Sequence, residues 1–227
     1  MTTLEMASAY ATFPAGGTYV APYGYTKVLD SDGKVGIEAK PIKYRVYSAE
    51  TCFLLTDILK DVVTSGWIRK YGGQIKNSKG KQIDAAGKTG TTSDNNDKWF
   101  CGFTSYYSAA VWYGYDNRLK QTKIPKTDYY NAGRIWEYCM KNIHKDLPAA
   151  SFKKPSTVVK VSYCSKSGMI PNDECKDAKT VKSDYFVKGS YLYPKEECTV
   201  HADPTPAPTG AVKPIKIITP TPEPDTG

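Results

Sequence analysis

The segment Ala86-Gly87-Lys88-Thr89-Gly90-Thr91-Thr92 combines one lysine with hydroxyl-bearing and small residues. On an extended chain, Thr89 and Thr91 point their hydroxyls to the same face, because side chains alternate along a strand. Lys88 supplies a compact positive charge, and Gly90 has no side chain to obstruct a ligand near the backbone. These properties suit a strand edge that holds a carboxylate. Because Lys-Thr-Gly also occurs by chance in turns, its meaning depends on the residues around it.

The residues that flank this segment are rich in strand patterns. Apolar and β-branched residues, separated by two short turns, predict three strands, Ile83–Thr91, Trp99–Thr104 and Ala109–Tyr115. Turns this short join antiparallel neighbours. Apolar residues then recur at helical spacing from Ala132 to Ile143, with Asp128 as the expected N-cap. The helix would cover the sheet, so we predict an α/β (α+β) fold with helices over an antiparallel sheet.

Two further helices are expected earlier in the chain. Thr2 and Glu5 fit the capping box of the first helix, which Gly16-Gly17 ends. Ser48 marks the start of the second, and core packing accounts for its apolar stripe, Leu55, Ile58, Leu59, Val62 and Val63. Between these helices the pattern predicts a strand pair over residues 25–29 and 34–37. The segment 67–82 has no periodicity and is expected to be a loop.

Composition limits the classes of function. The formal net charge of the 227-residue chain is +8 at pH 7, which would suit an anionic partner. The lysines are scattered and no nucleic-acid-binding signature accompanies them, so we predict a solvated basic surface and no nucleic-acid partner. No apolar run is long enough to span a bilayer, and the N-terminus lacks a signal-peptide pattern, so any anchor is expected outside this chain.

Three stretches together resemble the C-terminal part of the transpeptidase domain of class A penicillin-binding proteins. They are residues 3–13 with Gly16-Gly17, residues 86–92, and the run from Asp97 to Asp116. The segment from Ser167 to His201 also resembles one found beyond that domain. The resemblance covers residues 1–202 and implies a partial serine β-lactamase/transpeptidase-like fold.

The resemblance implies acyl transfer by a serine nucleophile. The substrate is a stem peptide ending in D-Ala-D-Ala, or a β-lactam that mimics it. By analogy, Lys88 and Thr91 are the expected catalytic residues: Lys88 biases the site electrostatically, and the Thr91 backbone N–H is one oxyanion donor. Thr89, with the Thr91 hydroxyl, would hydrogen-bond the substrate carboxylate, and Gly90 and Thr92 complete the expected binding residues. No cofactor is implied.

In the family that the chain resembles, the nucleophile is the serine of a Ser-x-x-Lys motif, assisted by a Ser-x-Asn motif. Neither motif is evident at a suitable place in this chain. Ser-x-x-Lys occurs at Ser78–Lys81 and at Ser151–Lys154, but the first lies in a loop directly before the Lys-Thr-Gly strand and the second follows it. The family's serine precedes that strand by a long way. Ser93-Asp94-Asn95 spells Ser-x-Asn, yet it sits where a turn is expected. We therefore expect both true motifs upstream of Met1, in an absent N-terminal half that would also carry the membrane anchor.

The six cysteines fall into two groups. Cys52, Cys101 and Cys139 lie on helical faces or in a strand and are expected to be buried free thiols. The extracytoplasmic, cell-envelope location that the resemblance implies permits disulfides. We expect a Cys175–Cys198 disulfide, with Cys164 free or as the alternative partner. A zinc site from Cys164, Cys175, Cys198 and His201 is the alternative, because Cys198-Thr199-Val200-His201 places two ligands close together. The remaining spacings are irregular and lack paired Cys-x-x-Cys motifs, so no metal site is expected. His144 is interpreted as a favourable charge at a helix end.

These inferences divide the chain into the transpeptidase part (1–148), a small β- and loop-rich extension (149–202) and a disordered Pro/Thr-rich tail (203–227). The leading function is a peptidoglycan D,D-transpeptidase that is inactive as this isolated piece. A D,D-carboxypeptidase or β-lactamase would share the strand chemistry. A basic, non-catalytic wall-binding module would explain the charge and the tail but not the context of Lys-Thr-Gly.

Overall fold

The structure is a computed structural model that describes residues 1–64, 75–115 and 123–201. The described chain forms two compact units, which are considered separately. The first comprises Met1–Val161 with Tyr185–Tyr193, and the second comprises Ser162–Asp184 with the residues from Pro194 onward. The expected tail at 203–227 lies outside the described residues.

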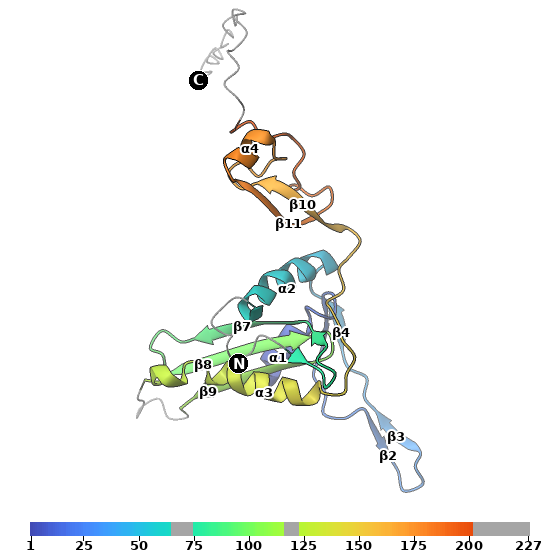
Figure 1. Ribbon diagram of the computed structural model, residues 1–227. Coiled ribbons are helices and arrows are strands. Elements are labelled where there is room, and N and C mark those ends of the chain that lie inside the picture. Colours follow the sequence, from blue (N-terminus) through green and yellow to red (C-terminus); the bar gives the residue numbers. More distant parts are fainter. Residues whose placement is uncertain (65–74, 116–122, 202–227) are drawn as a thin grey trace, which may run out of the picture. The chain divides into compact units, whose positions relative to one another are not determined.

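A three-stranded antiparallel sheet is the centre of the first unit (Figure 1). Its strand order is β7 (Ala85–Thr91), β8 (Asp97–Thr104) and β9 (Ser108–Gly114). Thr89 pairs with Phe100 across the β7–β8 ladder, and Phe100 pairs with Val111 across β8–β9. The prediction of three antiparallel strands joined by short turns is confirmed. Among the described strands, β7 is bonded on one side only, which leaves its other edge without a strand partner.

Helices cover both faces of this sheet, as side-chain alternation along β8 requires. On one face, Phe103 contacts the rings of Tyr10 and Phe13 from α1 (Thr3–Ala11) and the turn after it. On the other, Phe100 meets Trp136 of α3 (Asn131–Ile143) at a centroid distance of 5.0 Å. The main core lies between α3 and the sheet and consists of Val63, Ile75, Ile83, Ala85, Phe100, Ala132, Trp136 and Met140.

The predicted helices are present, with corrections to α3. The capping box of α1 is confirmed: Thr2 Oγ1 accepts from the Glu5 N–H at 3.2 Å, and Glu5 accepts from the Thr2 N–H at 2.7 Å. Asp128 is not the N-cap of α3. It belongs to a separate 3-10 turn, η3 (Lys126–Asp128), where its carboxylate accepts from the Tyr113 hydroxyl. The residue before α3 is Tyr130, which makes no side-chain cap.

The second helix, α2 (Ala49–Thr64), packs along β7, but its apolar stripe is only partly covered. Val63 is buried, whereas Leu55 and Ile58 are 37% and 64% exposed, so core packing does not explain the whole stripe. The loop expected at 67–82 is partly wrong, because β5 (Ile75–Lys76) and β6 (Gln82–Ile83) pair as a short hairpin. Residues 67–74 of that prediction lie outside the described residues.

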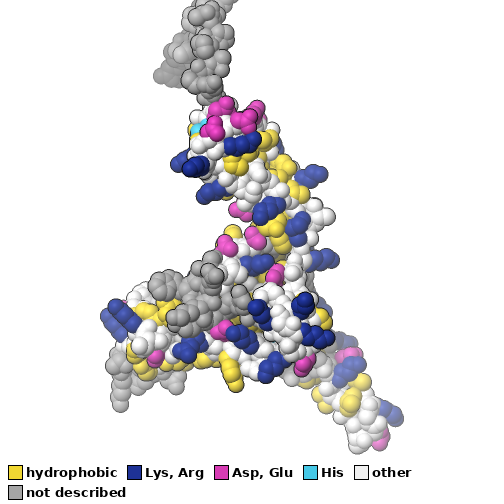
Figure 2. Space-filling view, in the orientation of Figure 1, with side chains coloured by type: hydrophobic (Ala, Val, Ile, Leu, Met, Phe, Trp, Pro, Cys, Tyr) yellow, Lys and Arg dark blue, Asp and Glu magenta, His cyan; other side chains and the backbone are white. Residues whose placement is uncertain are grey.

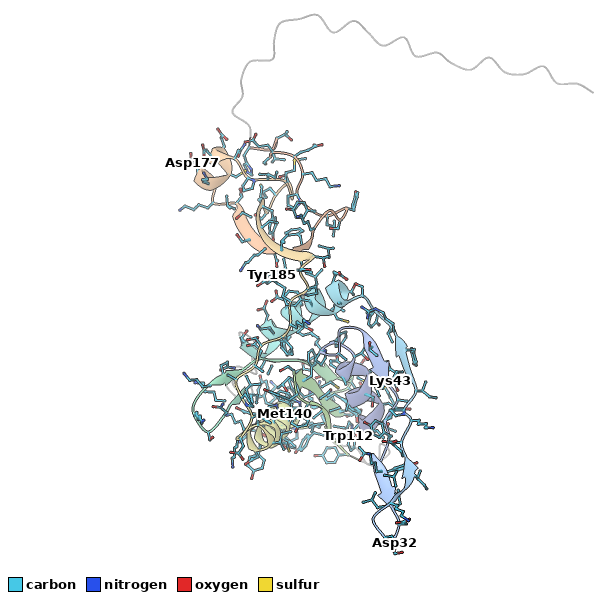
Figure 3. All side chains as sticks on the ribbon, turned by 90° about the vertical axis from the view of Figure 1, so that its right-hand side faces the viewer. Asp32, Lys43, Trp112, Met140, Asp177 and Tyr185 are labelled. Carbon is cyan, nitrogen blue, oxygen red and sulfur yellow. The ribbon has the colours of Figure 1, made fainter. Side chains whose placement is uncertain are left out.

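Two small strand pairs complete the first unit. The strands β1 (Thr18–Val20) and β4 (Lys43–Arg45) pair antiparallel. The predicted hairpin is confirmed as β2 (Lys27–Leu29) with β3 (Val35–Glu38), whose residues are all exposed. Its tip carries Asp32 and lies away from the three-stranded sheet (Figure 3).

The strands β10 (Val158–Cys164) and β11 (Val181–Val187) pair with each other and lead into the second unit. This unit also holds the short helix α4 (Asp173–Asp177), which ends at Asp177 (Figure 3). Asn172 caps α4 by accepting from the Cys175 N–H at 3.0 Å. In the described ranges, none of the helices has the length and apolar character needed to cross a bilayer.

Candidate functional site

The predicted site residues lie at the outer end of β7. Lys88, Thr89 and Thr91 are exposed, while the residues before them on the strand, from Ala85 to Gly87, are buried. Antiparallel register places Lys88 opposite Cys101 and Thr89 opposite Phe100. Lys88 therefore projects to the α1 face of the sheet, and Thr89 and Thr91 project to the α3 face. The side chain of Lys88 thus leaves the strand on one face and those of Thr89 and Thr91 leave it on the other, although the long lysine side chain brings its ammonium back toward Thr89.

A pocket adjoins each face of this strand end. One, of about 320 Å³, lies on the α3 side and is lined by Val62, Lys88, Thr89, Gly90, Thr91, Trp99, Tyr129, Tyr130, Ala132 and Gly133. The other, of about 360 Å³, lies on the α1 side and shares Lys88, Thr89, Gly90 and Trp99. Both combine aromatic walls with a few polar groups, which is the usual composition of a small-molecule site.

The Lys88 ammonium is held close to its own strand. Its Nζ donates to the Thr89 carbonyl at 2.9 Å and lies 3.5 Å from the Thr89 hydroxyl oxygen. A carboxylate bound at this edge could therefore meet the ammonium and the Thr89 hydroxyl together. Charge-assisted hydrogen bonds of this kind are about twice as strong as neutral ones.

Thr92 has a different environment from Thr89 and Thr91. Its Oγ1 accepts from the backbone N–H groups of Asn96 at 3.2 Å and Asp97 at 3.0 Å. Asn95 adopts a left-handed conformation (φ 57°) in the same turn, which confirms the turn interpretation of Ser93-Asp94-Asn95. The Thr92 hydroxyl oxygen thus stabilises the turn, although the residue also lines a further pocket with Trp99 and Trp112.

Lys98 lies beside the candidate site and was missed by the sequence reasoning. It pairs with Thr91 across the β7–β8 ladder and is only 4% exposed. Its Nζ donates to Asn95 Oδ1 at 2.9 Å and lies 3.4 Å from Thr91 Oγ1 and 3.7 Å from the centre of the Tyr129 ring. Burial lowers the pKa of Lys98 below its ordinary value. A second cation therefore lies behind the Thr91 hydroxyl, and only the strand register could have revealed it.

Close packing explains the two glycines of the motif. A Cβ on Gly90 would lie 3.1 Å from the Trp99 Cβ, so a side chain here would crowd the wall of both pockets. A Cβ on Gly87 would come within 2.6 Å of the Phe100 ring and 3.0 Å of the Cys101 carbonyl. Gly87 thus allows β7 to approach β8, and Gly90 keeps the strand edge open.

Neither Ser-x-x-Lys string forms a buried helix. Ser78 is exposed in the β5–β6 turn, where Asn77 Oδ1 accepts from the N–H groups of Lys79 and Lys81 and Gly80 has a φ of 70°. Ser151 lies in an irregular, exposed segment. Cys101 offers no thiolate in place of a serine, because burial raises its pKa to about 11 and keeps the thiol protonated at neutral pH.

His144 lies at the end of α3 as expected, but it is not the favourable charge that was expected there. It is fully buried, its Nδ1 lies 2.6 Å from the Met140 carbonyl, and its Nε2 lies 2.8 Å from Thr104 Oγ1. A carbonyl only accepts, so Nδ1 carries the proton and Nε2 accepts from the hydroxyl. Burial lowers the pKa of His144 below 6.5, which favours this neutral form.

The cysteines also depart in part from expectation. Cys52 and Cys101 are buried free thiols as predicted, but Cys139 is exposed on α3. Cys175 and Cys198, expected to form a disulfide, are free in the structure. Together with Cys164 and His201 they form a cluster whose ligand atoms all lie within 4.8 Å of one another. This cluster is the one group among the described residues with the side chains and spacing to hold a metal ion.

Comparison with known protein families agrees with this geometry. The family described as "Penicillin binding protein transpeptidase domain" matches residues 1–143, which include α1, the Lys-Thr-Gly strand and the rest of the three-stranded sheet. The chain belongs to the penicillin-binding protein transpeptidase family. A second family, "Penicillin-binding protein 1A, C-terminal domain", matches residues 154–203. The predicted resemblance to class A penicillin-binding proteins is therefore confirmed, both in the transpeptidase part and beyond it.

Curated relatives extend this similarity over most of the chain. Penicillin-binding protein 1A of Clostridium tetani is 36% identical over 209 residues, which cover 88% of this chain and 24% of that protein. Penicillin-binding protein 1F of Bacillus subtilis is 30% identical over 204 residues, covering 84% and 25%. The chain thus spans about a quarter of the length of these relatives.

Solved structures support the fold. Penicillin-binding protein 1A of Haemophilus influenzae superposes with a TM-score of 0.69 at 24% identity, covering 87% of this chain and 33% of that one. The Mycobacterium tuberculosis protein PonA1 gives a TM-score of 0.54 at 24% identity, covering 68% and 41%. The expected transpeptidase-like α/β fold is confirmed.

Proposed function

We propose that the chain forms one wall of the acyl-transfer site of a peptidoglycan D,D-transpeptidase. The observation that carries this proposal is the exposed end of β7, where Lys88, Thr89 and Thr91 lie beside two aromatic-lined pockets. Membership of the transpeptidase family supplies the reaction class. The substrate would be a stem peptide ending in D-Ala-D-Ala, and β-lactams would bind as its mimics.

Each residue has a distinct part in this proposal. Lys88 attracts the terminal carboxylate of the substrate, and the hydroxyls of Thr89 and Thr91 donate hydrogen bonds to it. The Thr91 backbone N–H donates to the oxygen that becomes negative when the serine attacks the peptide carbonyl. Gly90 lets the substrate backbone lie against the strand. Lys98, behind Thr91, is a positioning residue that orients the hydroxyl and adds positive potential.

The attacking serine would come from another part of a longer polypeptide. Ser78 and Ser151 do not suit the role, because both are exposed outside helices and an activated serine needs an adjacent base held in fixed geometry. The same longer polypeptide would carry the membrane anchor and place the site at the outer face of the cell envelope. The chain alone would therefore bind the substrate carboxylate weakly and form no acyl-enzyme.

Labelling with fluorescent penicillin tests this proposal. The isolated chain should show no covalent adduct by denaturing gel or intact mass. The same residues expressed in frame with their natural upstream sequence should be labelled on a serine outside residues 1–227. An acyl adduct mapped to Ser78 or Ser151 of the isolated chain would contradict the proposal that the nucleophilic serine lies outside this chain.

The acceptor of the acyl group distinguishes the transpeptidase from hydrolytic alternatives. In the longer protein, we expect a D-amino acid to be incorporated into a stem-peptide substrate when it competes with water. Release of D-Ala without incorporation would favour a D,D-carboxypeptidase, and rapid turnover of the penicillin label would favour a β-lactamase. Wall binding that survives Lys88→Ala, with no labelling at all, would favour a non-catalytic binding module.

A further inference from the structure

The second unit holds its three cysteines and its histidine around a single point. Cys164 ends β10, Cys175 lies in α4, and Cys198 and His201 lie in the turn that follows residue 197. The three cysteines are at most 3% exposed and form the buried cluster of this unit, with Met169 and Val181 packed against them. Successive members of this group are 11, 23 and 3 positions apart in the sequence, and folding brings them to one point.

The distances from His201 Nδ1 to the three sulfurs match those of a tetrahedral metal centre. His201 Nδ1 lies 3.5 Å from the sulfur of Cys164, 3.4 Å from that of Cys175 and 3.6 Å from that of Cys198. With Zn–S near 2.3 Å and Zn–N near 2.05 Å, a tetrahedral zinc ion would place nitrogen and sulfur about 3.6 Å apart. His201 Nδ1 is therefore nearly equidistant from the three sulfurs, at the distance expected for two ligands of one zinc ion.

Hydrogen bonding alone does not account for this arrangement. In the neutral imidazole, Nδ1 either donates one proton or accepts with one lone pair, so it can satisfy one thiol and not three. A disulfide would bring two sulfurs to about 2.05 Å and leave the third beside the ring. Three sulfurs converging on one nitrogen are instead the pattern of ligands around a shared cation.

Backbone hydrogen bonds position two of the four ligands in the folded unit. The Cys164 N–H donates to the Met169 carbonyl at 2.8 Å, within a turn that Gly168 closes with a φ of 75°. The Cys198 N–H donates to the Ile170 carbonyl at 2.8 Å, next to a parallel bridge between Ile170 and Glu197. In the folded unit these bonds therefore hold the sulfurs of Cys164 and Cys198 at the positions that the cluster requires.

Outer contacts orient the sulfur atoms. Ser167 Oγ donates to Cys198 Sγ at 3.2 Å, and its own oxygen accepts from the Met169 N–H at 3.2 Å. The Cys164 sulfur lies 3.6 Å from the Thr180 hydroxyl. Hydrogen bonds to ligating sulfurs are a regular feature of metal centres and tune their affinity.

From this geometry we propose that Cys164, Cys175, Cys198 and His201 bind one zinc ion. Three thiolates and one imidazole around one point favour zinc over the harder Mg²⁺ and Ca²⁺, which prefer oxygen ligands. All four positions are occupied by protein ligands, so the ion is structural and not catalytic. Because the unit buries almost no large apolar side chain, the metal supplies much of its folding free energy.

The metal content of the purified chain tests this proposal. Protein folded with excess zinc and then desalted should contain about one zinc per chain, measured by plasma mass spectrometry. The ligand variants Cys164→Ser and His201→Ala should lose it. Cys139→Ser is the matched control, because Cys139 is an exposed free thiol on α3, and it should retain full occupancy.

Cobalt substitution keeps the test independent of misfolding in the ligand variants. The Co²⁺ form should show the visible bands of tetrahedral cobalt and a thiolate-to-cobalt charge-transfer band. His201→Cys should retain the metal and raise that band by roughly a third, since three thiolates become four. Ser167→Ala should keep the tetrahedral spectrum and weaken zinc affinity by about 10- to 100-fold.

Three results would overturn the proposal. The first is a Cys175–Cys198 disulfide, found by peptide mapping in protein that was folded with excess zinc. The second is loss of zinc in Cys139→Ser equal to that in Cys164→Ser. The third is an octahedral cobalt spectrum that neither Cys164→Ser nor His201→Ala changes.

Discussion

The two units of this chain are stabilised by different means. The sheet unit buries large side chains, among them Trp136, Phe100 and Met140, between α3 and the strands. The smaller unit buries three cysteines and, among its described residues, no aromatic side chain. Hydrophobic burial of about 1.5–3 kcal/mol per large side chain can sustain the first unit but not the second. A small unit without such a core needs a cross-link, and the cysteine–histidine cluster is placed to hold one.

Metal removal should have the largest effect, and only on the smaller unit. Structural zinc contributes about 10–16 kcal/mol in zinc-finger peptides, so a strong chelator should abolish the fold around the cluster. Hydrogen exchange should then show loss of protection at the backbone N–H groups of Cys164 and Thr180. The N–H of Phe100, within the sheet, should keep its protection. Equal loss in both units would show that they are not stabilised separately.

Replacing a large side chain in the core of the sheet unit should destabilise that unit and leave the smaller unit unaffected. Trp136 is fully buried, donates its Nε1–H to the Gly102 carbonyl at 3.2 Å and packs edge-to-face on Phe100. We expect Trp136→Ala to destabilise the sheet unit by about 3–5 kcal/mol, measured by denaturant unfolding. Zinc content should be unchanged. A destabilisation below about 1 kcal/mol would contradict the packing described for α3, since it would be far under the range for buried aromatics.

Acid should weaken the sheet unit through His144. The folded pKa is depressed by burial, so the unfolded histidine binds a proton first as the pH falls. Stability is fully present above the ordinary value of 6.5 and is lost as the pH drops below it toward the folded pKa, by at most about 1.4 kcal/mol per pH unit. His144→Gln should remove this dependence near pH 6. An unchanged pH slope in that variant would assign the effect to other groups.

The smallest effect is expected at a surface ion pair. Glu137 and Lys141 lie one turn apart on α3, with 2.6 Å between Oε1 and Nζ. Such i,i+4 pairs contribute about 0.3–0.5 kcal/mol. Glu137→Gln should therefore lower the thermal midpoint only slightly, and less so in high salt. A loss comparable to that of Trp136→Ala would mean that α3 depends on its surface charges and not on its core.

Local patterns predicted much of this molecule. The capping box at Thr2 and Glu5, the three strands and the turn at Asn95 depend on neighbours in sequence, and all were recovered. The start of α3 was missed because η3 takes Asp128 into a separate turn. Ile58 was expected in the core because helical periodicity shows a stripe without showing what covers it.

The features that sequence missed depend on long-range contacts. Lys98 becomes part of the site only through cross-strand pairing with Thr91, and His144 is buried only because Thr104 and α3 enclose it. The cysteine–histidine cluster was considered from the sequence and set aside because its spacing is irregular; only the fold shows that its members come together. The roles assigned to Lys88, Thr89 and Thr91 remain predictions.

The central claim is that the Lys-Thr-Gly strand holds the substrate carboxylate. It is tested most directly by the rate constant for penicillin acylation of the longer protein that contains this chain. Lys88→Ala should lower that constant by roughly 10- to 150-fold, the equivalent of about 1.5–3 kcal/mol for a hydrogen bond to a charged group. Lys79→Ala, in the exposed β5–β6 turn, is the matched control and should leave it unchanged. Equal acylation of the Lys88→Ala variant and the unmodified protein would contradict the claim.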